Sequence, residues 1–250
     1  MSDTDDRAGR DPAPAVTRSI RLLGVLADAG RPMTLTELAG ALGLAKSSTA
    51  NLCLALEAGG LVERVATGYR LGLRIAELGG AFAAQFNQVR EFYSVCEASP
   101  VLSRELVQVA VLDGADVLYL ARYEGARSER LGAPLGSRLP AAVTASGQAL
   151  LMTRPDDEVR ELVPGADDAL LGRLAAARER GWTLDEGEGI AGIVGVAVPL
   201  EGWAPGDPQL ALGVGMPADR ADAAHLARVA EALQDAAAAL TNPLGASARR

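Results

Sequence analysis

The sequence predicts an α+β protein with an N-terminal winged helix-turn-helix and a C-terminal domain built on an antiparallel sheet. Residues 34–73 combine two short helices, a tight glycine turn and a small hairpin. From residue 106 onward the pattern changes to alternating strands with a few covering helices, which is typical of α+β domains. With 250 residues and 49% hydrophobic content, the chain can build two domains with cores of their own.

Five segments are expected along the chain. A disordered tail at 1–14 precedes the helix-turn-helix domain at 15–74, and a connecting helix at 75–97 leads to a second domain at 98–242 and a tail at 243–250. The apolar series of the connecting helix is too long for one small domain to bury. We therefore expect a dimer surface there; the alternative is that this helix packs on its own second domain.

Two helices open the first domain. The first is expected at 15–29, where four apolar side chains recur at helical spacing and can pack across the helix pair: Val16, Ile20, Leu23 and Leu26. Thr34 and Glu37 form the Thr-x-x-Glu pattern of a capping box, so the next helix begins there. Gly43 supplies the left-handed conformation that ends it.

The following helix, at about 45–58, is predicted to enter a DNA groove. A helix-turn-helix presents the N-terminal residues of its second helix to base edges. The residues expected to contact DNA are Thr36, Lys46, Ser47, Ser48 and Asn51, with Arg64 and Arg70 of the hairpin on flanking phosphates. The hairpin turn is expected at Thr67-Gly68. The alternative is that two amphipathic helices and a hairpin are merely part of a core.

The charge distribution supports a nucleic-acid partner for the first domain only. The whole chain carries −8, but residues 12–74 hold seven cations and four anions, a net of +3. The residues from 75 onward carry −9. A basic domain is thus joined to an acidic one, and DNA binding should weaken steeply with salt.

The composition of the chain indicates its cellular compartment and argues against disulfide and metal sites. The first residues lack the apolar core of a signal peptide, and no apolar run is long enough to span a bilayer, so we expect a cytoplasmic protein without membrane contact. Cys53 and Cys96 are too few and too far apart for a disulfide framework or a metal cluster. Cys53 falls on the apolar stripe of its helix and is expected in the core.

The second domain should contain two hairpin strands, three helices and two further strands. The first two strands are joined by a turn at Asp113-Gly114, and this pattern predicts a β-hairpin. The expected ranges are strands at 106–112 and 117–123, helices at 144–153 and 168–180, strands at 193–199 and 210–215, and a last helix at 219–240.

Enzyme motifs are weak in this chain. Gly187 to Gly192 and Gly213 to Ala218 match dinucleotide-binding patterns in letters, but neither has the strand, helix and acid that such a site needs. The single histidine, His225, lies beside an apolar helix stripe and is expected to be solvated. We therefore assign no catalytic residue, no metal ligand and no cofactor.

Four segments in order resemble the IclR family of bacterial transcription regulators. Two belong to the first domain: residues 16–23 with 35–49, and Gly68-Tyr-Arg-Leu-Gly. Two belong to the second: residues 136–140 with 144–151, and residues 180–188 with Gly192 and Ala197-Val-Pro. The resemblance covers nearly the whole chain.

The resemblance implies a GAF-like effector domain after the linker helix, and assembly as a homodimer or dimer of dimers on palindromic double-stranded DNA. It also implies a pocket for a small-molecule effector, lined by residues 144–147, the loop 185–195 and the strand 210–215. The residues that it places against the ligand are Ala145, Ser146, Asp185, Gly195, Gly213 and Gly215.

Three departures from the family pattern affect specificity. Asn51 stands where the family usually has Arg, and Gln148 replaces a common Lys. Gly195, Gly213 and Gly215 present no side chain where relatives often carry hydroxyl or thiol groups. We expect a wider, less polar pocket for a larger, partly apolar ligand, with Arg122 or Arg138 available for a carboxylate. The alternative is that other side chains fill the space.

These features predict a ligand-responsive DNA-binding transcriptional regulator, a repressor rather than an activator. Ligand binding would move the linker helices and change the spacing of paired recognition helices. Two other classes remain open. One is a small-molecule-binding enzyme with a vestigial helix-turn-helix, and the other is a purely oligomeric scaffold.

Overall fold

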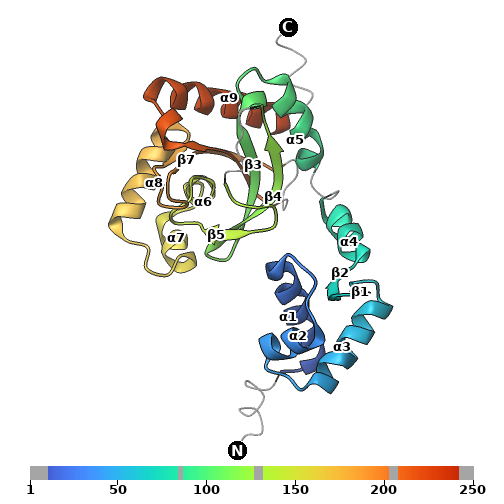
Figure 1. Ribbon diagram of the computed structural model, residues 1–250. Helices are drawn as coiled ribbons and strands as arrows, with labels where there is room; N and C mark the ends of the chain where they lie inside the picture. The colour runs from blue at the N-terminus through green and yellow to red at the C-terminus, as the bar shows by residue number, and fades with distance from the viewer. Residues whose placement is uncertain (1–10, 84–86, 127–131, 203–207, 242–250) are drawn as a thin grey trace, which may run out of the picture. The chain divides into compact units, whose positions relative to one another are not determined.

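The chain forms two compact units, Met1–Gln85 and Phe86–Arg250 (Figure 1). The computed structural model describes residues 11–83, 87–126, 132–202 and 208–241. Each unit has its own hydrophobic core and is described by itself. The predicted α+β class is confirmed, with a helix-turn-helix in the first unit and an antiparallel sheet in the second.

The N-terminal unit contains a three-helix core and a two-stranded wing. Its elements are α1 (Pro14–Ala29), α2 (Leu35–Leu42), α3 (Lys46–Ala58), β1 (Val62–Val65), β2 (Gly68–Leu71) and α4 (Leu73–Ala83). Leu22, Leu38 and Cys53 are fully buried between the helices, and Val62 and Tyr69 of the wing join them. Cys53 therefore lies in the core, as expected.

The capping box at the start of α2 is present as predicted. The Thr34 hydroxyl accepts from the Glu37 backbone N–H at 3.3 Å, and Glu37 Oε2 accepts from the Thr34 N–H at 2.7 Å. Arg31 adds an ion pair to Glu37 at 2.8 Å. The Arg31 guanidinium, together with the N–H and hydroxyl of Thr34, lowers the pKa of Glu37 to about 2. Gly43 ends the helix in the left-handed conformation.

The wing turns one residue earlier than expected. Val65 pairs with Gly68, so the loop is Ala66-Thr67 and not Thr67-Gly68. Gly68 is instead a strand residue whose φ is +140°. A Cβ there would lie 2.2 Å from the Met33 carbonyl oxygen. The absence of a side chain at Gly68 lets Met33 and Tyr69 exchange backbone hydrogen bonds and ties the wing to the segment before α2.

The buried face of α1 differs from the expected one. Leu22 and Leu26 are buried and Leu23 is half-buried, but the side chains of Val16 and Ile20 are 57% and 63% exposed. Helical spacing identified the correct stripe only for the second half of the helix.

The C-terminal unit is a six-stranded antiparallel sheet with helices on both faces. The strand order is β5-β4-β3-β8-β7-β6. The strands are β3 (Leu106–Asp113), β4 (Asp116–Glu124), β5 (Arg138–Pro140), β6 (Thr183–Asp185), β7 (Ile193–Leu200) and β8 (Leu210–Pro217). The helices are α5 (Asn87–Ala98), α6 (Ala145–Leu151), α7 (Asp156–Leu162), α8 (Asp168–Arg180) and α9 (Ala223–Thr241), with 3₁₀ turns at Leu102–Arg104 and Ala218–Arg220.

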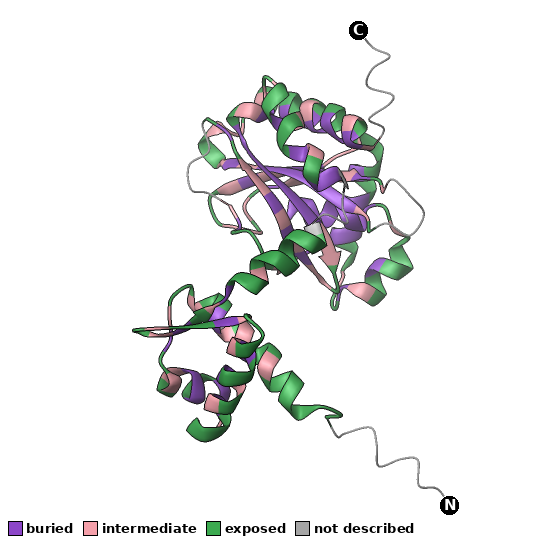
Figure 2. Cartoon of the chain, turned by 90° about the vertical axis from the view of Figure 1, so that its right-hand side faces the viewer, coloured by how far each residue is buried: buried purple, intermediate pink, exposed green. Residues whose placement is uncertain are grey.

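Strand alternation divides this unit into two cores. Helices α5 and α9 pack on one face of the sheet against valines and leucines of β3, β7 and β8. Helices α6, α7 and α8 cover the other face, where the strands present small residues such as Ala110, Ala197 and Ala211. Figure 2 shows the strands largely buried between the layers and the exposed residues on the outer sides of the helices. The small residues let α6 approach the sheet closely.

Several predicted boundaries change in the structure. The hairpin of β3 and β4 pairs Asp113 with Asp116, so its loop is Gly114-Ala115. The expected connecting helix corresponds to α4 and α5, and residues 84–86 between them lie outside the described residues. The last helix begins at Ala223, after a 3₁₀ turn, and not at Asp219. The sequence pattern did not reveal β5, β6 or α7.

Removal of the capping hydroxyl should destabilise the N-terminal unit. We expect Thr34→Ala to lower the free energy of unfolding of the helix-turn-helix unit by about 1 kcal/mol. It should also raise the Glu37 pKa from its low value, because one hydroxyl donor to the carboxylate is lost. Denaturant unfolding and an NMR titration of the Glu37 side chain measure the two effects. Thr36→Ala, at an exposed position in the first turn of the same helix, is the control and should leave both unchanged.

Candidate functional site

The N-terminal end of α3 presents the polar surface expected of a recognition helix. Thr49, Cys53 and Leu56 are buried on its inner face. Four predicted DNA-contacting residues are exposed on its other faces: Lys46, Ser47, Ser48 and Asn51. Thr49, the third hydroxyl of the series, is not available, because it is buried and donates to the Ala45 carbonyl at 3.1 Å.

The other three residues predicted to contact DNA are all exposed, but the two arginines among them already have partners within the wing. Thr36 is exposed on α2. Arg70 forms a 2.9 Å ion pair with Glu63, its cross-strand partner in the wing. The Arg64 guanidinium lies over the Tyr69 ring, 5.9 Å from the ring centroid. Both arginines are exposed, and Arg70 must exchange Glu63 for a phosphate if it binds DNA.

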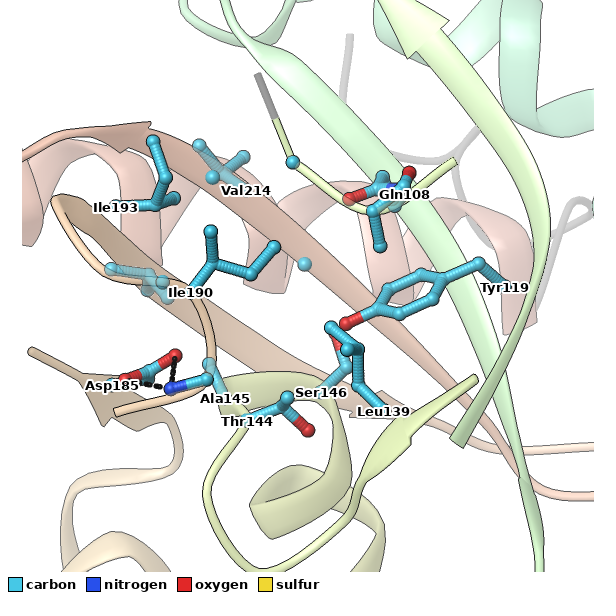
Figure 3. A pocket seen from close by; sticks show the side chains of 17 residues that line it. Gln108, Tyr119, Leu139, Thr144, Ala145, Ser146, Asp185, Ile190, Ile193 and Val214 are labelled. Carbon is cyan, nitrogen blue, oxygen red and sulfur yellow. Dashed lines mark hydrogen bonds between the residues drawn. The ribbon is translucent and has the colours of Figure 1, made fainter. Parts of the chain in front are cut away.

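The C-terminal unit contains a cavity of about 430 Å³, its open mouth included, between the sheet and the N-terminal end of α6. Figure 3 shows Tyr119 and Gln108 on one side of this cavity, Asp185 on the other, and Ile190 between them. Its lining residues are Gln108, Tyr119, Gly132, Ala133, Leu139, Thr144, Ala145, Ser146, Asp185, Gly189, Ile190, Ile193, Gly195, Val196, Gly213, Val214 and Gly215.

The structure brings together six of the eight residues predicted to bind ligand. Ala145, Ser146, Asp185, Gly195, Gly213 and Gly215 all line the cavity. Gln108 and Tyr119 also line it and were not predicted. A signal for Gln108 existed, because it is the one polar residue inside the apolar run Leu106 to Leu112, and a buried amide in a strand needs a partner. Its Nε2 donates to the Ala133 carbonyl at 2.7 Å.

The two predicted arginines do not line the cavity. Arg138, the first residue of β5, is half exposed and pairs with Asp113, the last residue of β3. Arg122 is the cross-strand partner of Gln108 but is not among the lining residues. Its Nη1 donates to the Ala133 carbonyl at 3.0 Å and its Nε pairs with Glu124 at 2.9 Å. The expectation that either guanidinium is available for a ligand carboxylate therefore does not match their positions here. The sequence pattern located the strand of Arg122 but not the short strand of Arg138, and it could not reveal the partners of either.

Asp185 organises the loop that closes one side of the cavity. Its Oδ1 accepts from the backbone N–H groups of Gly187 at 2.9 Å, Glu188 at 2.7 Å and Gly189 at 3.3 Å. Its Oδ2 accepts only from the Gly189 N–H, also at 3.3 Å. Burial raises the pKa of Asp185, and the three N–H donors oppose that rise.

Tyr119 contributes a phenolic hydroxyl from the opposite side. Burial raises the pKa of Tyr119, hydrogen bonding to Ser146 and Thr144 opposes the rise, and the nearby charge of Asp185 adds to it. Tyr119 is therefore a neutral hydroxyl at neutral pH, able both to donate and to accept.

The three glycines do not widen the cavity equally. A Cβ at Gly213 would lie 2.7 Å from Ser146 Oγ, and one at Gly195 would lie 3.0 Å from the Ala145 Cβ. Residues of α6 therefore already fill the space next to these two positions. At Gly215 a Cβ would meet only the Ile193 side chain, at 3.5 Å, and Leu106. The expected extra width is confined to the Gly215 end.

His225 is not solvated as expected. Its Nε2 lies 3.3 Å from Glu105 Oε1, and only 15% of its side chain is exposed. Glu105 is itself buried and pairs with Arg220 through both of its oxygens, at 2.7 and 2.9 Å. The histidine belongs to a buried polar cluster that joins β3 to the start of α9, outside the cavity.

Within the described residues, no three or more His, Cys, Asp or Glu side chains are grouped so that they could hold a metal ion. The helices described in the structure also include none that is both long and apolar enough to cross a membrane.

A winged helix-turn-helix joined to a sheet domain with a small-molecule cavity is the architecture of ligand-responsive DNA-binding regulators. Residues 15–66 match the IclR helix-turn-helix domain, and residues 96–242 match the bacterial transcriptional regulator IclR C-terminal domain. The chain therefore belongs to the IclR family of bacterial transcriptional regulators.

Individual relatives span almost the whole chain. The HTH-type transcriptional regulator XynR of Escherichia coli strain K12 is 26% identical over 246 residues, which cover 92% of this chain and 97% of XynR. The HTH-type transcriptional repressor AllR of Salmonella typhimurium is 27% identical over 247 residues, which cover 93% and 90%. The crystal structure of an IclR homolog from Microbacterium hydrocarbonoxydans, complexed with 4-hydroxybenzoate, has a TM-score of 0.76 at 26% identity and covers 93% of this chain and 99% of that one.

The position of α6 should depend on the absence of a side chain at Gly147. A Cβ there would lie 2.3 Å from the backbone of Ala141. We expect Gly147→Ala to destabilise the C-terminal unit by about 3 kcal/mol, because backbone atoms must separate. Gly172→Ala, an exposed position in α8 with no atom near its Cβ, should instead stabilise by about 0.5–1 kcal/mol. Denaturant unfolding of both variants measures the difference, and equal effects would contradict the close packing of α6.

Proposed function

We propose that this chain is a transcriptional repressor that binds operator DNA through α3 and releases it when a small organic metabolite enters the cavity of the C-terminal unit. The observation that carries the proposal is the presence in one chain of an exposed recognition surface and a separate buried cavity. Only the N-terminal domain is basic. The acidic remainder would disfavour DNA binding elsewhere.

The DNA-binding half of the proposal rests on the first turn of α3. Lys46 is exposed there beside the hydroxyls of Ser47 and Ser48 and has no ion-pair partner among the described residues. A cation and two small donors at the positive end of a helix dipole suit phosphate and base edges. Asn51, one turn further on, has the amide that can pair with adenine in the major groove.

The sensing half rests on the cavity and on what relatives bind. The cavity is lined mainly by apolar side chains with a few polar groups, which is the composition of a metabolite site. A family member of similar structure is a complex with 4-hydroxybenzoate, and AllR is named a repressor. Ser146 and Asp185 both line the cavity, but the described residues include no hydrogen bond between them, so Ser146 has no positioned base. This argues against the alternative of an enzyme with a vestigial helix-turn-helix.

Two copies of the chain are expected to act together on a palindromic operator. Leu73 and Leu78 of α4 are 82% and 49% exposed, and such apolar side chains suit a contact with a second copy. A dimer, or a dimer of dimers, would place two recognition helices at a fixed spacing. We propose that ligand binding changes this spacing, in a protein that works in the cytoplasm.

Loss of the Lys46 charge should weaken DNA binding in a salt-dependent way. We expect Lys46→Ala to lower affinity for the DNA upstream of its own gene roughly tenfold, as for one charge-assisted contact. It should also reduce the slope of log affinity against log salt by about one unit per subunit. Fluorescence anisotropy over a salt series measures both quantities.

Arg160→Ala is the matched control for the loss of one positive charge. Arg160 is exposed on α7, in the other unit, and pairs with Asp168. Its loss should leave affinity and salt slope unchanged. If both variants weakened binding equally, the effect would come from net charge and not from α3.

A further inference from the structure

The outward face of α3 carries a large apolar side chain that the N-terminal unit does not bury. Leu54 is 58% exposed. The core of the unit takes up the opposite side of the helix, where Thr49, Cys53 and Leu56 are buried. A single exposed leucine is common on protein surfaces, so its place on the helix decides what it can do.

Helical spacing places Leu54 in line with two residues of the proposed DNA-contacting surface. Ser47, Asn51 and Leu54 stand at i, i+4 and i+7, the positions that share one face of a helix, and all three are exposed. Ala58 continues this row and is exposed as well. Glu57, the acid that the structure describes in α3, lies outside the row. The face that carries Leu54 can therefore approach phosphates without charge repulsion from its own side chains.

The side chains of Asn51 and Leu54 extend equally far from the helix. Both branch at Cγ and end in two heavy atoms, so the methyl groups of Leu54 reach the depth of the Asn51 amide. The two residues are about 4.5 Å apart along the helix axis, and successive base pairs are about 3.4 Å apart along DNA. Where the Asn51 amide meets the edge of one base pair, the Leu54 methyl groups meet the next.

The major groove offers one apolar group to such a side chain. Thymine presents the methyl group on its C5 there, next to the O4 acceptor, whereas the other three bases present hydrogen-bonding groups without a methyl. Leucine methyl groups placed against those polar groups would leave them without a partner. Leu54 therefore fits a thymine better than any other base.

We propose that Leu54 is a specificity-determining residue of this regulator, which reads a thymine by packing on its methyl group in the base pair next to the one that Asn51 contacts. The inference rests on the proposed binding of operator DNA through α3. The contact removes a methyl group from water, and its loss should lower affinity about fourfold for each half-site.

Replacement of thymidine by deoxyuridine in the DNA tests this contact, because it removes the methyl group and keeps the pairing. Anisotropy of the full chain compares the two forms of the DNA upstream of its own gene. The unmodified chain should bind the thymidine form at least about fourfold more tightly than the deoxyuridine form. In Leu54→Ala the side chain ends at Cβ, so the ratio of the two affinities should fall by at least the same factor. Effects of the replacement on DNA shape act on both proteins and cancel in this comparison.

Leu135→Ala is the matched control for the loss of an exposed leucine. Leu135 is 61% exposed and belongs to the C-terminal unit, so this variant should keep the ratio of the unmodified chain. Leu54→Ala should fold normally, because Leu54 is outside the core and alanine favours a helix at least as much as leucine. Thermal unfolding followed by circular dichroism checks this point.

An equal ratio in Leu54→Ala and in the unmodified chain would overturn the proposal. A change in the oligomeric state of that variant by light scattering, with the ratio unchanged, would show that Leu54 contacts a second copy of the chain. In both cases salt-dependent binding of the thymidine DNA remains, so only this inference fails. Failure of the unmodified chain to bind the thymidine DNA at low salt would overturn the proposed function as well.

Discussion

The close approach of α6 to the sheet is the constraint on which the cavity depends. Gly147 allows the helix backbone to lie against Ala141, and Gly213 leaves room in the sheet for Ser146. Thr183 strengthens the contact, because its buried hydroxyl donates to the Ala145 carbonyl at 2.8 Å. Together these contacts place Thr144 and Ala145 beside Asp185, and Ser146 beside Tyr119, in the cavity wall.

The same packing explains why glycine in the sheet does not simply mean an open pocket. A missing side chain in β8 is compensated by a serine from α6, so polarity moves from the strand to the helix and the space stays filled. The few polar groups that remain in the lining then decide the specificity of the cavity. In the N-terminal unit, Gly68 plays a comparable part by letting the wing backbone pair with Met33.

Much of the local structure could be predicted from the sequence. The capping box of Thr34 and Glu37, the stop at Gly43 and the buried Cys53 follow from local rules, because capping and helical periodicity act over a few residues. Six ligand-site positions followed from resemblance to the family, not from spacing. Helix α7 had a usable signal as well, since Pro155 precedes three acids in the first turn.

What the sequence could not reveal depends on long-range partners. The cluster of Glu105, Arg220 and His225 joins residues more than a hundred positions apart, and no local pattern shows it. The exposure of Val16 and Ile20 depends on where the rest of the domain ends. The three-residue strands β5 and β6 are too short for alternation to be visible, and Arg138 could be placed only once its pairing with Asp113 was seen.

The most direct test of the central claim compares the affinity of the full chain for the DNA upstream of its own gene with its affinity for a scrambled sequence of equal composition. Anisotropy over a salt series is the measurement. The account predicts tighter binding to the upstream DNA and a steep loss of affinity with salt. Failure to bind either DNA even at low salt would contradict it.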